Sequence, residues 1–407
     1  MNPSPVPASP WRLARRVDQI EPFWVMECAK AADRIAASPA CDPAHGGEPM
    51  LYLNIGEPDF TAPPRVVEAA RAALADGRTQ YTAATGTPAL REAIARWYGQ
   101  RWGLDIDPAR IVVTAGASAA LQLLCTALVE PGDEILMPDP SYPCNRHFVT
   151  AAGGTPRLLP SGAAQRFQLD AASVAAAWGP ATRGVMLASP SNPTGTSIAT
   201  DELARIVEVV RARGGITIVD EIYLALGYDD AHDRSALALG EDVLVINSFS
   251  KYFGMTGWRL GWLVLPEALV APVEKLAQNL YICASALAQH AALACFEPDT
   301  LAECERRRAE FRARRDWLVP QLEAIGLPVP VRPDGAFYVW FDTRAHAASS
   351  WDFCLDMMDR AHVALTPGRD FGHAETGHHA RLSFASSMDV LHEAVRRLDR
   401  ALNTPRA

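Results

Sequence analysis

Short aliphatic runs recur along the middle of the chain, and segments with helical periodicity separate most of them. The helical segments include residues 119–128 and 201–213, where apolar side chains return every three or four positions. Seven aliphatic runs predict strands, over residues 111–114, 134–137, 157–159, 184–188, 216–219, 243–247 and 261–264. About seven strands joined by crossover helices predict an α/β fold with one mainly parallel sheet that is covered on both faces.

The pattern changes downstream of this region. A long charged helical stretch over residues 300–324 precedes three short predicted strands, over residues 336–341, 363–366 and 381–384. This order predicts a smaller α+β domain, and the helical segment 23–36 is expected to pack on it. We therefore expect a large domain over residues 51–297. The small domain is expected to combine residues 16–50 with 298–407, and residues 1–15 to form an N-terminal arm.

Composition narrows the class of protein. A chain of 407 residues exceeds the size at which one core keeps growing, which agrees with two domains. Hydrophobic residues make up 49% of it, but no apolar run approaches the ~20 residues that span a bilayer, so we expect no membrane segment. A net charge of -9 disfavours a protein whose main partner is nucleic acid. Eight scattered cysteines without a C-x-x-C pair predict free thiols in the cytoplasm, and no signal peptide is expected.

Ligands in open α/β sheets bind at the carboxyl ends of the strands, so the residues after each run are informative. The first run leads into Ala115-Gly116-Ala117-Ser118-Ala119, where small residues open a helix and allow its N–H groups to approach a phosphate. An ordinary tight turn is the alternative interpretation. The fourth run ends in a polar turn over residues 189–196, which places an amide side chain at the sheet edge or serves only as turn chemistry.

Two ionisable residues follow the next two runs. Asp220 closes an apolar run, and a carboxylate there needs a cationic partner or hydrogen-bond donors to stay ionised. A helix N-cap is the alternative role. Lys251 stands in an aromatic and glycine-rich setting over residues 248–261, where desolvation lowers an amine pKa and favours Schiff-base chemistry. An ordinary surface lysine is the alternative.

These loops together resemble those of the class I/II aminotransferases, a family of pyridoxal-5′-phosphate (PLP) enzymes. The shared motifs are S-N-P-T-G at 191–195, D-E-x-Y at 220–223 and S-x-S-K with G-x-R-x-G between 248 and 261. Further matches are residues 54–60, Tyr81, residues 140–143 and residues 381–384, so the resemblance spans roughly residues 50 to 390. It implies the PLP-dependent transferase fold type I, with a mainly parallel seven-stranded sheet in the large domain and a smaller α+β domain.

The resemblance also implies roles for the residues that bind the cofactor ring. Lys251 would hold PLP as a Schiff base and then act as the base at the substrate Cα. Asp220 would keep the pyridine nitrogen protonated, which makes the ring an electron sink. Asn192 and Tyr223 would hydrogen-bond the phenolate oxygen of the ring, and Tyr142 would stack on it.

Phosphate and substrate contacts follow from the same resemblance. The phosphate would bind the N–H groups of Ala117 and Ser118, the Ser118 and Ser248 hydroxyls and the Arg259 guanidinium. Tyr81 would reach the phosphate of the neighbouring subunit, which implies a homodimer with shared active sites. The α-carboxylate of the substrate would bind a small set of groups. These are the Arg381 fork, the Asn192 side chain and the Gly56 backbone.

The resemblance implies an aminotransferase that moves the amino group of an L-amino acid to 2-oxoglutarate or pyruvate in two half-reactions. A PLP lyase or synthase of the same fold remains the alternative. A regulator fused to a DNA-binding module is disfavoured, because about 50 residues precede the first motif. The histidines at 373, 378 and 379 lack metal-site spacing and are interpreted as solvated, so no metal is expected. Trp24, Tyr281 and Arg369 are candidates for the side-chain pocket.

Overall fold

The computed structural model describes residues 11–229 and 232–404, and the first ten residues of the expected N-terminal arm lie outside this part of the chain. A seven-stranded sheet forms its centre, in the order β2-β8-β7-β6-β5-β3-β4. The strands are β2 (Ile111–Thr114), β3 (Glu134–Asp139), β4 (Thr155–Pro160), β5 (Thr182–Ala188), β6 (Ile216–Asp220), β7 (Leu244–Ser248) and β8 (Gly261–Val264). The prediction of seven strands in these places is confirmed.

Six of the seven strands run in the same direction, and β8 runs antiparallel to both of its neighbours, β2 and β7. The expected mainly parallel α/β sheet is therefore confirmed. Because parallel strands end at one edge, Ala188 of β5 is level with Asp220 of β6, and Asp220 is level with Ile246 of β7. The residues that follow these strands therefore lie close together.

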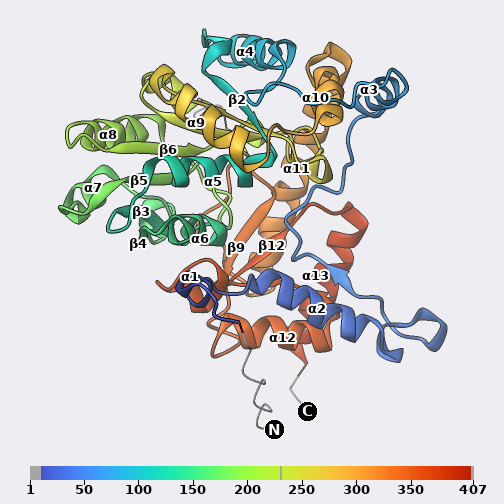
Figure 1. Ribbon diagram of the computed structural model, residues 1–407. Helices are drawn as coiled ribbons and strands as arrows, with labels where there is room; N and C mark the ends of the chain where they lie inside the picture. Colours follow the sequence, from blue (N-terminus) through green and yellow to red (C-terminus); the bar gives the residue numbers. More distant parts are fainter. Residues whose placement is uncertain (1–10, 230–231, 405–407) are drawn as a thin grey trace.

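Helices cover both faces of the sheet (Figure 1). One face packs against α4 (Pro88–Trp102), α7 (Ala171–Ala177) and α8 (Thr200–Arg211), and the other against α5 (Gly116–Leu128), α6 (Pro143–Ala152) and α9 (Glu267–Leu280). Successive strand residues serve the two faces in turn: Val113 belongs to the first core and Val112 to the second. Aliphatic runs without polar alternation follow from this double burial.

The second part of the molecule contains an antiparallel sheet of β9 (Tyr338–Asp342), β11 (Thr366–Pro367) and β12 (His379–Ser383), in the order β11-β12-β9. Beside it, β1 (Leu51–Tyr52) pairs in parallel with β10 (Val363–Ala364). Figure 1 shows α2 (Trp24–Ala36), α12 (Ser350–Arg360) and α13 (Met388–Asn403) around these strands, below the large sheet. The remaining helices are α1 (Arg15–Asp18), α3 (Pro64–Ala75), α10 (Ala286–Ala292) and α11 (Pro298–Ala324).

The strand expected over residues 363–366 is divided in the structure. Val363 and Ala364 pair with β1, whereas Thr366 and Pro367 pair with β12. All eight cysteines have free thiols, as expected from their spacing. Within residues 11–229 and 232–404, no helix is long and apolar enough to cross a membrane.

Candidate active site

The sequence-predicted site residues converge where β5, β6 and β7 end. Asn192 follows β5, Asp220 is the last residue of β6, and Lys251 lies three residues after β7. Arg381 approaches from the other sheet, where it lies on β12. Its Nη1 donates to Asn192 Oδ1 at 2.8 Å, so this hydrogen bond joins residues from the two sheets. The site is therefore built between both parts of the molecule.

Lys251 presents its amine inside this site. Its Nζ donates to the Gly56 carbonyl oxygen at 2.6 Å. Burial lowers the pKa of the Lys251 amine to about 8, while Glu57 opposes and Arg381 reinforces the shift. The chain has two other lysines, Lys30 and Lys275, and both are exposed on helices. Lys251 is thus the one lysine whose amine is directed into the interior, and a larger fraction of it is unprotonated near neutral pH.

Asp220 is a buried carboxylate whose counter-charge does not come from an adjacent cation. Its Oδ1 accepts the Ile222 N–H at 3.0 Å, and among the described residues no ion pair to Asp220 occurs within 4 Å. Burial raises the pKa of Asp220 to about 6, although the Ile222 N–H and Lys251 oppose this shift. A protonated ring nitrogen bound against Asp220 would supply the missing charge, so the residue fits the pyridine ring of PLP.

Arg381 is held on several sides by three hydrogen bonds, which leave part of its guanidinium available. Its Nη2 donates to the Asn54 carbonyl oxygen at 2.6 Å and to Thr366 Oγ1 at 3.2 Å. In the described part of the chain, the buried Nε–H of Arg381 and both side-chain amide atoms of Asn54 lack hydrogen-bond partners. Buried donors without partners are costly, so a ligand carboxylate at this position would satisfy them.

The phosphate-binding candidates lie at the N-terminus of α5. Gly116 begins this helix with a φ of +81°, and a Cβ there would lie 2.8 Å from Arg259 Nη2. Glycine therefore allows the Arg259 guanidinium to lie against the start of α5, whose first N–H groups, those of Ala117 and Ser118 among them, have no acceptor within the helix. Ser248 is buried at the end of β7, with its Oγ 2.9 Å from Ser250 Oγ and 3.1 Å from the Leu260 carbonyl oxygen. The helix N-terminus and the arginine together fit a phosphate group.

Two of the predicted tyrosines are largely enclosed, and a third lies apart. The Tyr223 hydroxyl is buried, and Tyr142 lies at the start of α6 with its ring 6.3 Å from that of Phe23. Tyr81 precedes α4 and is 79% exposed, so its side chain is not part of this pocket in the single chain.

Comparison with known proteins agrees with this geometry. The family model described as Aminotransferase class I and II matches residues 48–398. The chain belongs to this family. It is a PLP-dependent aminotransferase of fold type I, and it moves the amino group of an L-amino acid to a 2-oxo acid.

Individual relatives of this aminotransferase cover nearly its whole length. The valine–pyruvate aminotransferase of Mycobacterium tuberculosis is 38% identical over 95% of this chain and 97% of its own. The arginine–pyruvate transaminase of Pseudomonas aeruginosa is 36% identical over 86% and 90%. Among solved structures, the aspartate aminotransferase of Thermus thermophilus with maleate superposes with a TM-score of 0.88 at 32% identity, covering 96% of this chain and 100% of its own.

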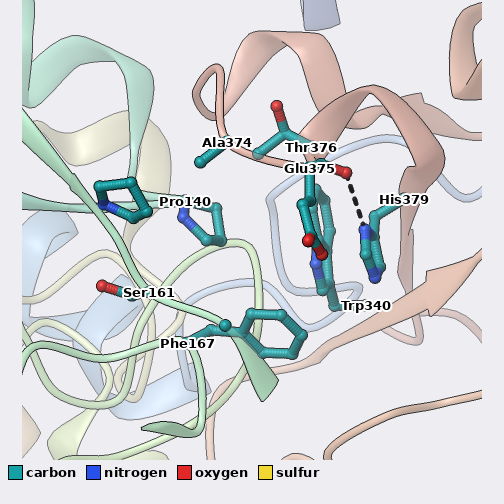
Figure 2. Close-up of a pocket in the computed structure, with 10 residues that line it drawn as sticks. Pro140, Ser161, Phe167, Trp340, Ala374, Glu375, Thr376 and His379 are labelled. Carbon is teal, nitrogen blue, oxygen red and sulfur yellow. Dashed lines mark hydrogen bonds between the residues drawn. The ribbon is translucent and has the colours of Figure 1, made fainter. Parts of the chain in front are cut away.

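The histidine-containing loop of this aminotransferase lies beside a small cavity of about 100 Å³, shown in Figure 2. His379 stacks on the Trp340 ring at an interplanar angle of 4°, and its Nδ1 lies 3.1 Å from the Glu375 carbonyl oxygen. The interpretation of these histidines as solvated is therefore wrong for His379, which is buried. It holds for His373 and His378, which are exposed. His379 is buried because it begins β12 and faces the strand partner β9.

Sequence reasoning missed two aromatic residues of the site, Phe23 and Tyr338. Phe23 lies in a predicted helix and Tyr338 in a predicted strand, and aromatic residues in such elements usually belong to the core. By contrast, Trp24 and Arg369 pack on each other, with the guanidinium 4.1 Å from the Trp24 ring centre, and Arg369 also stacks on Trp351. Trp351 belongs to α12, so this arginine is directed toward that helix.

Proposed function

We propose that the residues gathered here carry out transamination in the roles that their chemistry allows. Lys251 holds the cofactor and then moves the proton at the substrate Cα, for which its lowered amine pKa suits it. Arg381 and Asn192 orient the α-carboxylate of the substrate. Bound PLP supplies an electron sink for the charge that develops at Cα. The observation that carries the proposal is the buried Asp220, which forms no ion pair within 4 Å in the described part of the chain and would be matched by a protonated ring nitrogen.

The proposal also assigns the residues that contact the cofactor. Tyr223 and Asn192 donate to the ring oxygen, and Tyr142 packs on the ring face. The phosphate binds the N-terminus of α5, at Ala117 and Ser118, together with Arg259. The Ser118 and Ser248 hydroxyls are proposed to add two further phosphate contacts, for which Ser248 Oγ would turn from Ser250 Oγ and the Leu260 carbonyl oxygen. The Gly56 backbone completes the substrate site.

The amino donor is proposed to be an L-amino acid with an uncharged, apolar side chain. Phe23 lies against Tyr142, and the Phe371 ring lies 5.1 Å from the Arg381 guanidinium, so aromatic surface surrounds the carboxylate site. The nearby cation Arg146 is occupied, since it donates to the Asp370 carbonyl oxygen at 3.1 Å and pairs with Glu21 at 3.4 Å. A second substrate carboxylate would meet this apolar surface rather than an available cation.

Pyruvate is proposed as the acceptor ahead of 2-oxoglutarate, because relatives from two organisms carry pyruvate in their names. The enzyme is further proposed to be a cytoplasmic homodimer in which Tyr81 reaches the active site of the partner subunit. The proposed domains are residues 51–297 and residues 16–50 with 298–407.

Spectra of the holoenzyme test the proposed substrates. The visible cofactor band is expected to bleach at least 10-fold faster with L-valine than with L-aspartate or L-arginine, because apolar surface rejects charge. Pyruvate should restore the band. Fastest bleaching by L-aspartate would overturn the donor assignment. Release of ammonia from β-substituted donors would instead indicate the lyase alternative, and Lys251→Ala is the inactive control.

A further inference from the structure

Tyr338 contacts two residues of the candidate active site, Tyr223 and Arg381. It lies on β9, directly opposite Ser383 of β12, and is fully buried. Its hydroxyl oxygen is 2.8 Å from that of Tyr223, and the two rings meet at 80°. The Arg381 guanidinium lies over the Tyr338 ring, 4.4 Å from its centre. One side chain thus contacts both the residue assigned to the ring oxygen of the cofactor and the residue assigned to the substrate carboxylate.

The direction of the hydroxyl pair follows from counting protons. Each tyrosine hydroxyl has one proton to donate. If Tyr223 donates its proton to the ring oxygen of the cofactor, its own oxygen must accept the proton of Tyr338. The order is therefore Tyr338 to Tyr223 to cofactor, and hydrogen bonds in such a chain polarise and strengthen one another.

We propose that Tyr338 is a positioning residue that couples the two ends of the active site. Its hydroxyl strengthens Tyr223 as a donor to the cofactor, and its ring supports Arg381 against the substrate carboxylate. This inference rests on the proposed roles of Tyr223 and Arg381.

Two neighbouring features fit this assignment. Gly56 leaves room for the hydroxyl, because a Cβ at that position would lie 2.7 Å from the Tyr338 oxygen. The Gly56 carbonyl oxygen in turn accepts a hydrogen bond from the Lys251 amine. A single residue, Gly56, therefore lies next to both the Tyr338 hydroxyl and Lys251. Tyr338 belongs to the three-stranded sheet, whereas Tyr223 follows β6 of the large sheet. The hydrogen bond between the two hydroxyls therefore also connects the two sheets across the site.

A pH titration of the visible band of the holoenzyme tests the two hydroxyls separately, because the band reports the proton on the cofactor-bound Lys251 nitrogen. Losing the Tyr223 hydrogen bond destabilises the charge on the ring oxygen and raises the midpoint. We expect a rise of about one pH unit in Tyr223→Phe and about 0.3 unit in Tyr338→Phe. Tyr98→Phe is the matched control, since Tyr98 is equally buried but bonds Trp262, and its midpoint should equal that of the wild type.

A second pair of variants tests the ring. Tyr338→Phe keeps the ring beneath Arg381, so the KM for the amino donor should change less than twofold. Tyr338→Leu removes the ring and should raise KM about fivefold or more, as expected for a lost cation–π contact. An unchanged midpoint in Tyr338→Phe beside a shifted Tyr223→Phe would overturn the coupling alone. No shift in either variant would refute the proposed role of Tyr223, and equal KM values in the Phe and Leu variants would refute support of Arg381.

Discussion

At the scale of single residues, Asp220 shows how the cofactor site is maintained at a cost to the protein without cofactor. Burial raises its pKa from 3.8 to about 6, which means that folding disfavours the ionised carboxylate. A group with a raised pKa in the folded state stabilises the protein fully below its unfolded pKa and loses that contribution as the pH rises through the folded value. The cofactor-free protein is therefore penalised above about pH 6.

The variant Asp220→Asn removes this penalty while keeping the acceptor for the Ile222 N–H. In the cofactor-free state, its free energy of unfolding should exceed that of the wild type by about 3 kcal/mol at pH 8, and the difference should fall to a small value near pH 4. Urea denaturation across this range measures it. A difference that stays constant with pH would contradict the ionisation argument, and Asp76→Asn, at an exposed helix end, is the control.

Position in the sequence explains which of these residues could be predicted. Asn192, Asp220 and Lys251 directly follow aliphatic runs, and the edge of a parallel sheet brings such residues together. Tyr338 gave no such signal, because an aromatic residue inside a strand looks like any core residue. Its role depends on contacts with Tyr223 and Arg381, which are 115 and 43 residues away in sequence.

At the scale of elements, α11 anchors the segment that contains Gly56, whose carbonyl oxygen accepts the Lys251 amine. Arg314, which is buried on this helix, donates from Nη1 and Nη2 to the two carboxylate oxygens of Asp59 at 2.8 and 2.9 Å. Its guanidinium also lies 5.1 Å from the Phe60 ring centre. Asp59 is three residues from Gly56, so this bidentate pair fixes the turn whose carbonyl accepts the Lys251 amine.

Replacing Arg314 with an uncharged residue leaves the Asp59 carboxylate without its bidentate guanidinium partner. Arg314→Met should lower the free energy of unfolding of the holoenzyme by about 3 kcal/mol, in the range expected for partly buried ion pairs. Arg312→Met on the same helix is exposed and should change it by less than about 0.5 kcal/mol. Urea unfolding at one fixed protein concentration compares the two, and equal losses would show that Asp59 and Arg314 do not anchor the turn.

Elements themselves were predictable to within a few residues, but their directions were not. An aliphatic run specifies burial on both faces, and this property is the same for a parallel and an antiparallel strand. The pattern therefore located β8 but could not show that it runs against β2 and β7. The division between β10 and β11 was missed for a similar reason, since one short run was shared by two sheets.

At the scale of the whole molecule, the exposure of Tyr81 is explained by the proposed homodimer. Mixing tests this directly. If Tyr81 serves the partner's site, a dimer of one Tyr81→Ala and one Lys251→Ala subunit contains one intact site. Random reassociation of equal amounts should then restore about a quarter of the wild-type activity at limiting PLP.

The control mixes Lys251→Ala with Arg381→Leu, whose defects fall in the site of their own subunit. Each site of that hybrid keeps one defect, so no activity should return. Recovery in the control as well, or none in the Tyr81 mixture, would contradict the sharing of active sites.

The antiparallel placement of β8 also affects the order of events during translation. In the described part of the chain β2 pairs with β8 alone, and β8 ends 150 residues after β2 does. At ribosomal speeds of about 5 to 20 residues per second, β2 emerges roughly 8 to 30 seconds before its partner. The nascent chain can meanwhile pair β3 with β4 and β5, and β5 with β6. The proposed phosphate site at the end of β2 is consequently among the last parts of the large sheet to assemble, and we expect cofactor capture to follow synthesis of β8.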